Sequence, residues 1–258
     1  MNYIGIDIGS TCAKTVVLNE KKELILEFVQ PTGWSSVDTA EEIRQKLEFA
    51  GINLSNESSH CVATGYGRIS VPYADKTVTE ITCHALGAVH LFQHPDLTVI
   101  DIGGQDTKII QIEQRFVKDF IMNDKCAAGT GRFLEVMANT LSLRPNEMFD
   151  LARLGSDTTI SSMCTVFAES EVIGLIGKGE PKEYIAYAVV NSTIRKVAAQ
   201  VSRMNGEMFT FCLTGGLCEC DYIREALSKE LGKDVFSCPD ARYAGAIGAA
   251  ISAMKVRR

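Results

Sequence analysis

The start of the chain alternates between hydrophobic and polar positions with a period of two. Ile4, Ile6 and Ile8 share one face of the predicted strand 3–8, and a second apolar run, 15–18, follows a short polar turn. A period of two is typical of half-buried β-strands, and two such runs joined by a small polar loop favour a hairpin. The pattern therefore predicts that the chain opens with two antiparallel strands.

The same strand–turn–strand pattern returns near the middle of the chain, at residues 97–113. Asp7-Ile8-Gly9 is followed by Lys14, seven positions after Asp7, and Asp101-Ile102-Gly103 is followed by Lys108 at the same spacing. A repeated segment of this kind predicts two related halves. The repeat is short, so two unrelated hairpin turns remain the alternative.

Helical periodicity dominates the rest of the chain, with glycine-containing loops between the periodic segments. The predicted strands are 62–64 and 208–213, and the predicted helices are 40–50, 79–92, one beginning at 127–132, one beginning after Cys164, 184–205, 222–231 and 244–256. No linker rich in Pro, Gly and Ser interrupts this order, so the two halves are expected to be closely connected.

Composition supports a packed core and excludes several classes of partner. The 258 residues are 46% hydrophobic and 22% charged, which is ordinary usage for a globular chain. The net charge of −6 is spread along the sequence, so no basic face favours nucleic acid or an anionic membrane surface. The longest uncharged stretch, 81–95, is fifteen residues long and contains three histidines, which is too short for a spanning helix. We therefore expect no nucleic-acid partner and no membrane segment.

The N-terminal residues carry none of the features of an export signal. Met1 leads directly into the first predicted strand, with no basic segment, apolar core or small-residue cleavage site, so a cytoplasmic protein is expected. Thiols stay reduced in the cytoplasm. The nine cysteines are therefore interpreted as metal ligands, catalytic groups or inert core residues rather than as disulfides.

Cys126 and Cys164 occupy positions where a thiolate is stabilised. Each stands just before a predicted helix, whose free N–H groups and positive dipole end stabilise an anion by about 0.3–1 kcal/mol. A cubane iron–sulfur cluster needs four cysteine ligands, which two chains with two cysteines each would supply. From spacing alone, a buried inert cysteine at a helix start remains the alternative. The other seven cysteines do not match the spacing of a zinc site.

Three glycine-containing loops follow predicted strands and favour a phosphate-bearing ligand. Asp7-Ile8-Gly9-Ser10-Thr11 and Asp101-Ile102-Gly103-Gly104 each place a carboxylate at a strand end before a tight turn whose N–H groups can hold phosphate oxygens. Gly215-Gly216 follows a third strand and would allow close approach of a flat group such as adenosine. Neither a Walker loop nor a dinucleotide G-x-G-x-x-G at the first strand is present. The three loops together predict a nucleotide site.

Six motifs in this order resemble the activator component of 2-hydroxyacyl-CoA dehydratases, a family that also contains the ATPase subunits of benzoyl-CoA reductase. The resemblance spans nearly the whole chain, and its most specific motif surrounds Cys126. The motifs are Asp7-Ile8-Gly9-Ser10-Thr11, Thr64-Gly65-Tyr66-Gly67-Arg68, Asp101-Ile102-Gly103-Gly104-Gln105-Asp106, the segment 122–133, the segment 164–171 and Thr214-Gly215-Gly216.

The resemblance implies a fold and a set of cofactors. The fold would be α/β, with two ribonuclease-H-like halves of the acetate and sugar kinase, Hsp70 and actin superfamily and a nucleotide cleft between them. The first half would comprise 1–96 with helix 244–258 packed back on it, and the second half 97–243. The resemblance also implies a homodimer that shares one [4Fe-4S] cluster, with the residues matching Cys126 and Cys164 of each chain as its ligands.

The implied activity is ATP-dependent donation of one electron to a 2-hydroxyacyl-CoA dehydratase, after reduction by a ferredoxin or flavodoxin. A small-molecule kinase of the same superfamily and a non-redox, nucleotide-gated regulator are the alternatives. No insertion in this short chain looks like the substrate domain that a kinase would need. The partner, its acyl-CoA substrate and the physiological reductant cannot be identified from the sequence.

The predicted nucleotide site distributes roles over the loops. Asp7 and Asp101 are expected to organise Mg²⁺ through water, because Mg²⁺ keeps several waters and few carboxylates. Gln105 is expected either to orient the attacking water or merely to cap its turn. Lys14 would add a point charge. The backbone groups expected to bind phosphates belong to Gly9, Ser10, Thr11, Gly103, Gly104, Gly129, Thr130 and Gly131, and those expected near adenosine to Gly215 and Gly216.

Overall fold

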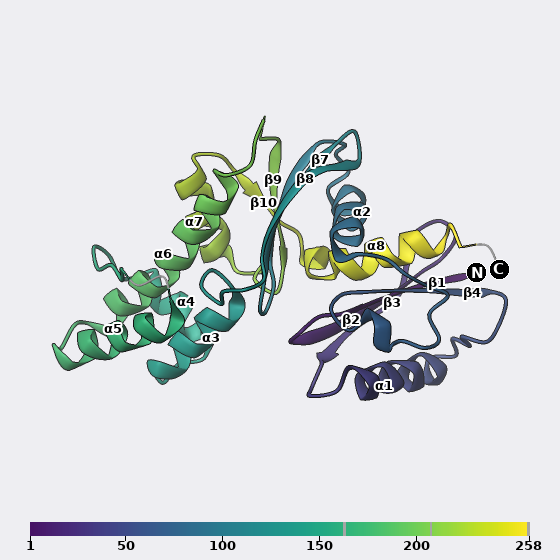
Figure 1. Ribbon diagram of the computed structural model, residues 1–258, viewed down its shortest axis with the longest axis horizontal. Coiled ribbons are helices and arrows are strands. Elements are labelled where there is room, and N and C mark those ends of the chain that lie inside the picture. The colour runs from purple at the N-terminus through teal and green to yellow at the C-terminus, as the bar shows by residue number, and fades with distance from the viewer. Residues whose placement is uncertain (162–163, 207, 257–258) are drawn as a thin grey trace. The chain divides into compact units, whose positions relative to one another are not determined.

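The computed structural model describes residues 1–161, 164–206 and 208–256 and contains two five-stranded sheets with helices around them (Figure 1). The chain divides into two compact units. The first contains residues 1–97, 110–118 and 240–258, and the second contains residues 98–109 and 119–239.

The first sheet has the strand order β3-β2-β1-β4-β5. Its strands are β1 (Asn2–Ile8), β2 (Cys12–Leu18), β3 (Leu24–Pro31), β4 (Ser59–Thr64) and β5 (Lys76–Thr77). β1 and β2 are antiparallel, as the alternating pattern predicted, with Asp7 opposite Lys14. β4 runs parallel to β1 and places Thr64 beside Asp7, so both strands end at the same edge of the sheet.

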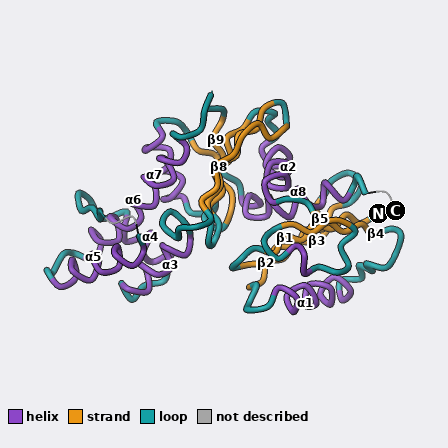
Figure 2. Tube along the Cα trace, in the orientation of Figure 1, coloured by secondary structure: helices purple, strands orange, loops and turns teal. Residues whose placement is uncertain are grey.

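Helices cover both faces of the first sheet (Figure 2). Ile43 and Leu47 of α1 (Ser36–Phe49) pack in one core cluster with Ile4, Ile6 and Ile8. On the other face, α8 (Ala244–Ala253) packs against β1, β2, β4 and α2 (Glu80–Phe92). A Cβ at Gly5 would overlap the backbone of α8, which explains why this strand and this helix are built from small residues at their contact. A short 3₁₀ helix, Arg68–Ser70, follows β4.

The second sheet repeats this order. Its strands are β6 (Leu97–Ile102), β7 (Thr107–Glu113), β8 (Phe116–Asn123), β9 (Thr210–Gly215) and β10 (Val235–Phe236), in the order β10-β9-β6-β7-β8. Counted along the chain, each sheet places its first strand in the centre, its second and third on one side and its fourth and fifth on the other. The fourth and fifth strands are parallel in both sheets. The predicted duplication is therefore confirmed by the strand topology.

Helices of the second unit occupy the chain between β8 and β10. They are α3 (Gly131–Thr140), α4 (Pro145–Ala152), α5 (Thr165–Gly177), α6 (Lys182–Val201) and α7 (Asp221–Leu231), and a 3₁₀ helix, Pro239–Tyr243, precedes α8. α6 packs against α3, α4, α5 and α7 and supplies much of the buried helical core.

Five strands and helices were missed by the sequence patterns. β5 and β10 have two residues each, too few to form a pattern. β8 is exposed along most of its length and β3 at half of its positions, so neither shows the alternation of a half-buried strand. α4 has only eight residues and begins at Pro145, and about two turns of periodicity are too few to distinguish from a loop. Along the described residues, no helix is both long enough and apolar enough to cross a membrane.

Candidate functional site

The first glycine loop joins β1 to β2 at the sheet edge where Asp7 lies. The loop is closed by the Gly9 N–H, which donates to the Cys12 carbonyl oxygen over 3.1 Å, and by the Thr32 hydroxyl, which donates to the Gly9 carbonyl oxygen over 2.7 Å. The Ser10 N–H has no acceptor within the described part of the chain. These two hydrogen bonds therefore fix the turn, and the Ser10 amide stays available to a ligand.

Asp7 is 4% exposed, yet its Oδ1 atom has no hydrogen-bond partner in the described structure. Its Oδ2 atom lies 3.9 Å from Nε2 of the buried His84 on α2. Gly65, just beyond β4, has φ +85°, and a Cβ there would lie 2.5 Å from Asp7 Oδ1 and overlap the Ile8 carbonyl. Burying a carboxylate oxygen without a hydrogen-bond partner costs free energy, so a cation or a hydrogen-bonding water is expected at this position.

The second glycine loop carries a carboxylate whose partners are complete. Asp101, 2% exposed, accepts a hydrogen bond from the Thr214 hydroxyl at Oδ1 over 2.7 Å. Its Oδ2 atom lies 3.2 Å from Nζ of Lys108, which is 1% exposed. The same ammonium lies 2.6 Å from Oδ2 of Asp106. One lysine thus neutralises part of the charge of two carboxylates inside the second unit.

Lys14 and Lys108 occupy equivalent places in the repeat but differ in environment. Lys14 is half-buried, and no carboxylate lies within 4.0 Å of its ammonium among the residues that the structure describes. Lys108 is fully enclosed with Asp101 and Asp106. The first loop therefore offers a buried carboxylate oxygen without a hydrogen-bond partner and an unpaired lysine, whereas in the second loop the carboxylates are paired with Lys108.

A second sequence repeat, missed in the sequence patterns, surrounds both carboxylates. Thr64-Gly65 follows β4 and Thr214-Gly215 ends β9, and the two glycines have φ values of +85° and +86°. A Cβ at Gly215 would overlap the Ile102 carbonyl and lie 3.0 Å from Asp101 Oδ1. Thr-Gly occurs four times in the sequence, at 32–33, 64–65, 130–131 and 214–215, and the position of two of these pairs at the end of the fourth strand of each half was the missing signal.

The loop that contains Cys126 is attached to the second glycine loop. Asn123 donates from Nδ2 to the carbonyl oxygens of Cys126 and Ala128 over 2.8 and 3.2 Å. At the start of α3, the Gly131 N–H donates to the Gly103 carbonyl oxygen over 2.9 Å and the Arg132 N–H to the Gly104 carbonyl oxygen over 2.8 Å. The first amides of α3 therefore bind the glycine loop itself, so the two loops are joined by hydrogen bonds.

Cys164 is exposed and forms the N-cap of α5. Only Ala168 and Val172 of this helix are buried, although the helix is rich in apolar residues. Four of its side chains are between 46 and 67% exposed: Val166, Phe167, Ile173 and Ile176. Exposed apolar faces of this kind mark interaction surfaces.

The remaining predicted positions are distributed as follows. Gln105 is exposed in the turn between β6 and β7. The Gly216 N–H donates to the Ile102 carbonyl oxygen over 3.2 Å, so this amide already has an acceptor. Thr130 is buried as the N-cap of α3, and Gly129, at φ +88°, accepts a hydrogen bond from the Thr107 hydroxyl over 2.6 Å. No group of three His, Cys, Asp or Glu residues converges as a metal site in the ranges that the structure describes.

Comparison with solved structures defines the class of the protein first. The chain shares its fold with a ROK family glucokinase from Streptomyces griseus solved with glucose and AMPPNP, at a TM-score of 0.59 and 16% identity over 99% of this chain and 100% of that one. Together with the two repeated sheets, this likeness shows an α/β fold of two related halves. The predicted fold class is confirmed.

The particular family follows from closer matches. The BadF/BadG/BcrA/BcrD ATPase family model matches residues 4–253, and the chain belongs to this family. It is 42% identical over 257 residues, 98% of this chain and 96% of the relative, to the (R)-2-hydroxyglutaryl-CoA dehydratase activating ATPase of Acidaminococcus fermentans.

Two solved structures of relatives superpose over almost the whole chain. The crystal structure of the Acidaminococcus fermentans (R)-2-hydroxyglutaryl-CoA dehydratase component A matches with a TM-score of 0.90 at 40% identity, over 99% of this chain and 98% of that one. The 2-hydroxyisocaproyl-CoA dehydratase activator from Clostridium difficile with bound ADPNP matches with a TM-score of 0.88 at 32% identity, over 100% and 99%. The predicted resemblance to dehydratase activators is confirmed.

Proposed function

We propose that this protein is an ATP-dependent one-electron donor that activates a 2-hydroxyacyl-CoA dehydratase. One observation carries the proposal: an exposed cysteine caps an apolar, uncovered helix, and a second cysteine lies in a loop hydrogen-bonded to a predicted phosphate loop. The relatives' names supply the dehydratase as partner. The proposal keeps the predicted division into halves 1–96 with 244–258 and 97–243.

The two glycine loops would serve the nucleotide in different ways. Asp7 fits the role of organising Mg²⁺ through water, because its Oδ1 atom is buried and unpartnered. Lys14 is available to a phosphate. Asp101 already binds Thr214 and Lys108, so its part would be to hold the loop and any metal-bound water rather than to coordinate the ion directly.

The glycines near Cys126 are assigned a different role from the direct phosphate binding that the sequence predicted. Because the Gly131 N–H already binds the Gly103 carbonyl oxygen, we propose that Gly129, Thr130 and Gly131 shape the phosphate loop from behind. The amides of Ser10, Gly104 and Gln105 have no acceptor in the described residues and are the proposed phosphate donors. The Gln105 side chain is exposed and able to orient the attacking water.

The thiols of Cys126 and Cys164 fit an iron–sulfur cluster shared by two chains. Each chain offers an exposed thiol at the N-cap of α5 and a partly buried thiol, Cys126, in the loop five residues before α3, not directly before the helix as predicted; a cubane cluster with four cysteine ligands requires two such pairs. The exposed apolar face of α5 beside Cys164 supplies surface that a homodimer would bury. When bound, such a cluster supplies one-electron redox chemistry at low potential, which ferredoxin or flavodoxin would recharge.

The hydrogen bonds from α3 to the second glycine loop would couple nucleotide state to electron release. Movement of Gly103 and Gly104 on hydrolysis would displace Gly131 and Arg132, and with them the loop of Cys126. A ligand shifts a two-state element only through different contacts in the two states, and these two hydrogen bonds are the candidate contacts.

Separate loss of the two activities tests the proposal. The protein is purified anaerobically, reduced, and mixed with ATP and a 2-hydroxyacyl-CoA dehydratase component, while phosphate release and reduction of the dehydratase are followed. We expect Asp7→Asn to keep iron and lose hydrolysis, and Cys164→Ser to lose iron and electron transfer while still binding ATP. A protein that hydrolyses ATP, holds no iron after anaerobic reconstitution and still activates the dehydratase would contradict the redox role and favour the nucleotide-gated regulator.

A further inference from the structure

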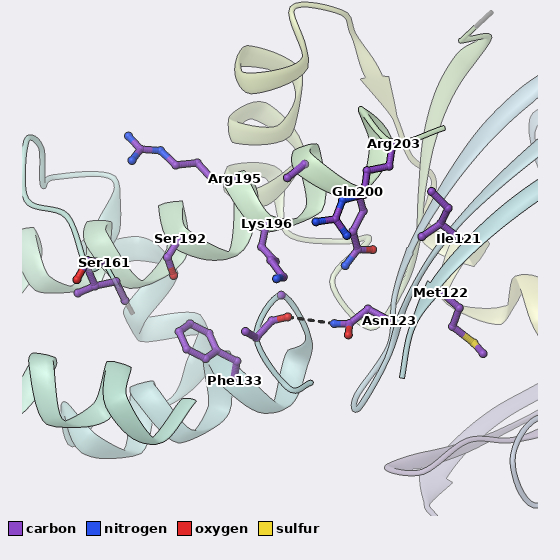
Figure 3. A pocket seen from close by; sticks show the side chains of 14 residues that line it. Ile121, Met122, Asn123, Phe133, Ser161, Ser192, Arg195, Lys196, Gln200 and Arg203 are labelled. Atoms are coloured by element: carbon purple, nitrogen blue, oxygen red, sulfur yellow. Dashed lines mark hydrogen bonds between the residues drawn. The ribbon is translucent and has the colours of Figure 1, made fainter. Parts of the chain in front are cut away.

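A pocket of about 360 Å³ lies entirely within the second unit, and Gly129 is the one residue it shares with those assigned above to phosphate and adenosine. It is bounded by the end of β8, the loop before α3 and the last turns of α6 (Figure 3). Its size falls in the range of sites for small organic ligands. We call it the α6 pocket, and the residues that carry the argument are Asn123, Gly129, Phe133, Lys196, Gln200 and Arg203.

Two cations reach into the α6 pocket without a carboxylate partner. Lys196, on α6, and Arg203, in the turn just after it, point toward Asn123 and Gln200, whereas Arg195 of α6 points away from them (Figure 3). None of the three has an acidic side chain within 4.0 Å among the described residues. In a chain with a net charge of −6, two unpaired cations in one concave site indicate an anionic ligand.

Gln200 provides a second, independent indication. It is 3% exposed, and neither its Oε1 nor its Nε2 atom has a hydrogen-bond partner in the described structure. Its amide lies in the pocket beside Arg203 (Figure 3). Buried amides are almost always satisfied, so an orphaned donor and acceptor in a pocket indicate that a ligand supplies both partners.

The opposite wall of the α6 pocket is apolar. Ile121, Phe133 and Ile160, from elements other than α6, line it, and Phe133 is 2% exposed and therefore fixed in the core. A flat or aliphatic body would bury against this wall while its charged end reaches Lys196 and Arg203.

We propose that the α6 pocket binds a small organic anion, in which a carboxylate or phosphate is joined to an apolar or flat body bearing a group that both donates and accepts hydrogen bonds. The anion pairs with Lys196 and Arg203, and the polar group pairs with the Gln200 amide. This site is additional to the proposed nucleotide site and does not depend on iron.

The floor of the α6 pocket links it to the rest of the second unit. A Cβ at Gly129 would lie 2.9 Å from Cγ of Lys196, so the lysine stem rests on the loop that contains Cys126. Asn123, another lining residue, holds that loop through the Cys126 and Ala128 carbonyl oxygens. Occupancy of the pocket therefore changes the free energy of the same loop that contacts Gly103 and Gly104, and the pocket is placed to act as an effector site.

Calorimetric titration with three probes tests the site and its ligand class. AMP carries a phosphate on a flat base, pantothenate carries a carboxylate and an amide on an aliphatic body, and benzoate carries a carboxylate on a flat ring. Each is titrated into the full-length protein with saturating Mg-ADPNP, so that a conventional nucleotide site is already filled. We expect saturable binding of at least one probe, weakened about tenfold or more by Arg203→Gln.

Matched variants separate a binding role from a structural one. Arg195→Gln removes a guanidinium of α6 that points away from Gln200, and it is expected to leave binding unchanged. Gln200→Met keeps the side-chain volume and removes the orphaned amide, so it is expected to raise the melting temperature of the free protein while weakening binding. The proposal is overturned if no probe binds at concentrations up to about 10 mM, or if ADPNP blocks every probe. It is also overturned if the Arg195 and Arg203 variants weaken binding equally, or if Gln200→Met lowers the melting temperature and leaves binding unchanged.

Discussion

The two lysines of the repeat provide a sharp test of how the glycine loops differ. Lys108 is 1% exposed, and its ammonium lies 2.6 Å from Asp106 Oδ2 and 3.2 Å from Asp101 Oδ2. Lys14 stands at the equivalent position of the first half, half-buried and without a carboxylate partner in the described residues. Lys108→Met and Lys14→Met therefore remove the same ammonium from two opposite environments.

The expected cost follows from what each substitution leaves behind. Lys108→Met leaves two carboxylates beside each other, one of them fully buried, and breaking a buried ion pair in this way costs about 3–5 kcal/mol. For a chain of this size, each kcal/mol lowers the melting temperature by about 2–4 °C. Lys14→Met breaks no pair, so we expect a change within about 0.5 kcal/mol, as for other substitutions away from buried networks.

Thermal unfolding and nucleotide titration of both variants measure the contrast. We expect Lys108→Met to lower the melting temperature by about 6–20 °C. The triple variant Lys108→Met, Asp101→Asn, Asp106→Asn should recover a large part of that loss, because no uncompensated charge remains. Lys14→Met should keep its stability and bind ATP more weakly. Equal destabilisation by the two single variants would refute the assignment of a structural role to one lysine and a ligand role to the other.

Three further predictions concern the glycine turn, the attacking water and the buried thiols. Gly65→Ala is expected to lower both stability and ATP affinity, because its Cβ would overlap the Ile8 carbonyl near Asp7. Gly51 has a similar positive φ but lies in open space, so Gly51→Ala should cost only about 1–2 kcal/mol by thermal unfolding and leave ATP affinity intact. Gln105→Ala should retain ATP affinity and lose phosphate release, and unchanged hydrolysis would exclude its role with water. Burial raises the pKa of the Cys83 thiol to about 12, so iodoacetamide at pH 8 should modify the exposed Cys164 by mass spectrometry and leave Cys83 protonated and unmodified until the protein unfolds.

The raised pKa of Cys83 also fixes the sign of one pH effect. The thiol stays protonated in the folded state while the unfolded thiol ionises near its ordinary pKa, so its contribution to stability is present below that pKa and is lost as the pH rises toward about 12.

Much of the fold was predictable because its strands and helices carry strong local patterns. β1 and β6 end at Asp-Ile before a glycine, β2 and β7 contain runs of apolar residues, and the long buried helices show helical periodicity. β3 and β8 could not be predicted in this way, because exposed edge strands lack a buried face. Their place in the sheet depends on hydrogen bonds to a neighbouring strand, which no local window of sequence contains.

The equivalent positions of Asp7 and Asp101 at strand ends were predictable from the sequence, but their charge balance was not. The sequence assigned Asp7 and Asp101 the same role, yet only Asp7 retains an unpartnered buried oxygen, because Thr214 and Lys108 reach Asp101 from β9 and β7. Gln200 showed no sequence signal at all, since one glutamine on a helix is ordinary. Its significance lies in the absence of a partner in the described structure, which only three-dimensional packing determines.

The proposed sharing of one cluster by two chains is the central claim, and the iron content of the dimer tests it most directly. Anaerobically reconstituted protein is separated by size, and iron, acid-labile sulfide and protein are measured in the monomer and dimer fractions. We predict one [4Fe-4S] cluster per two chains in the dimer, none in the monomer, and loss of iron in both Cys126→Ser and Cys164→Ser. A full cluster in each monomer, or a cluster retained after Cys164→Ser, would contradict the proposal.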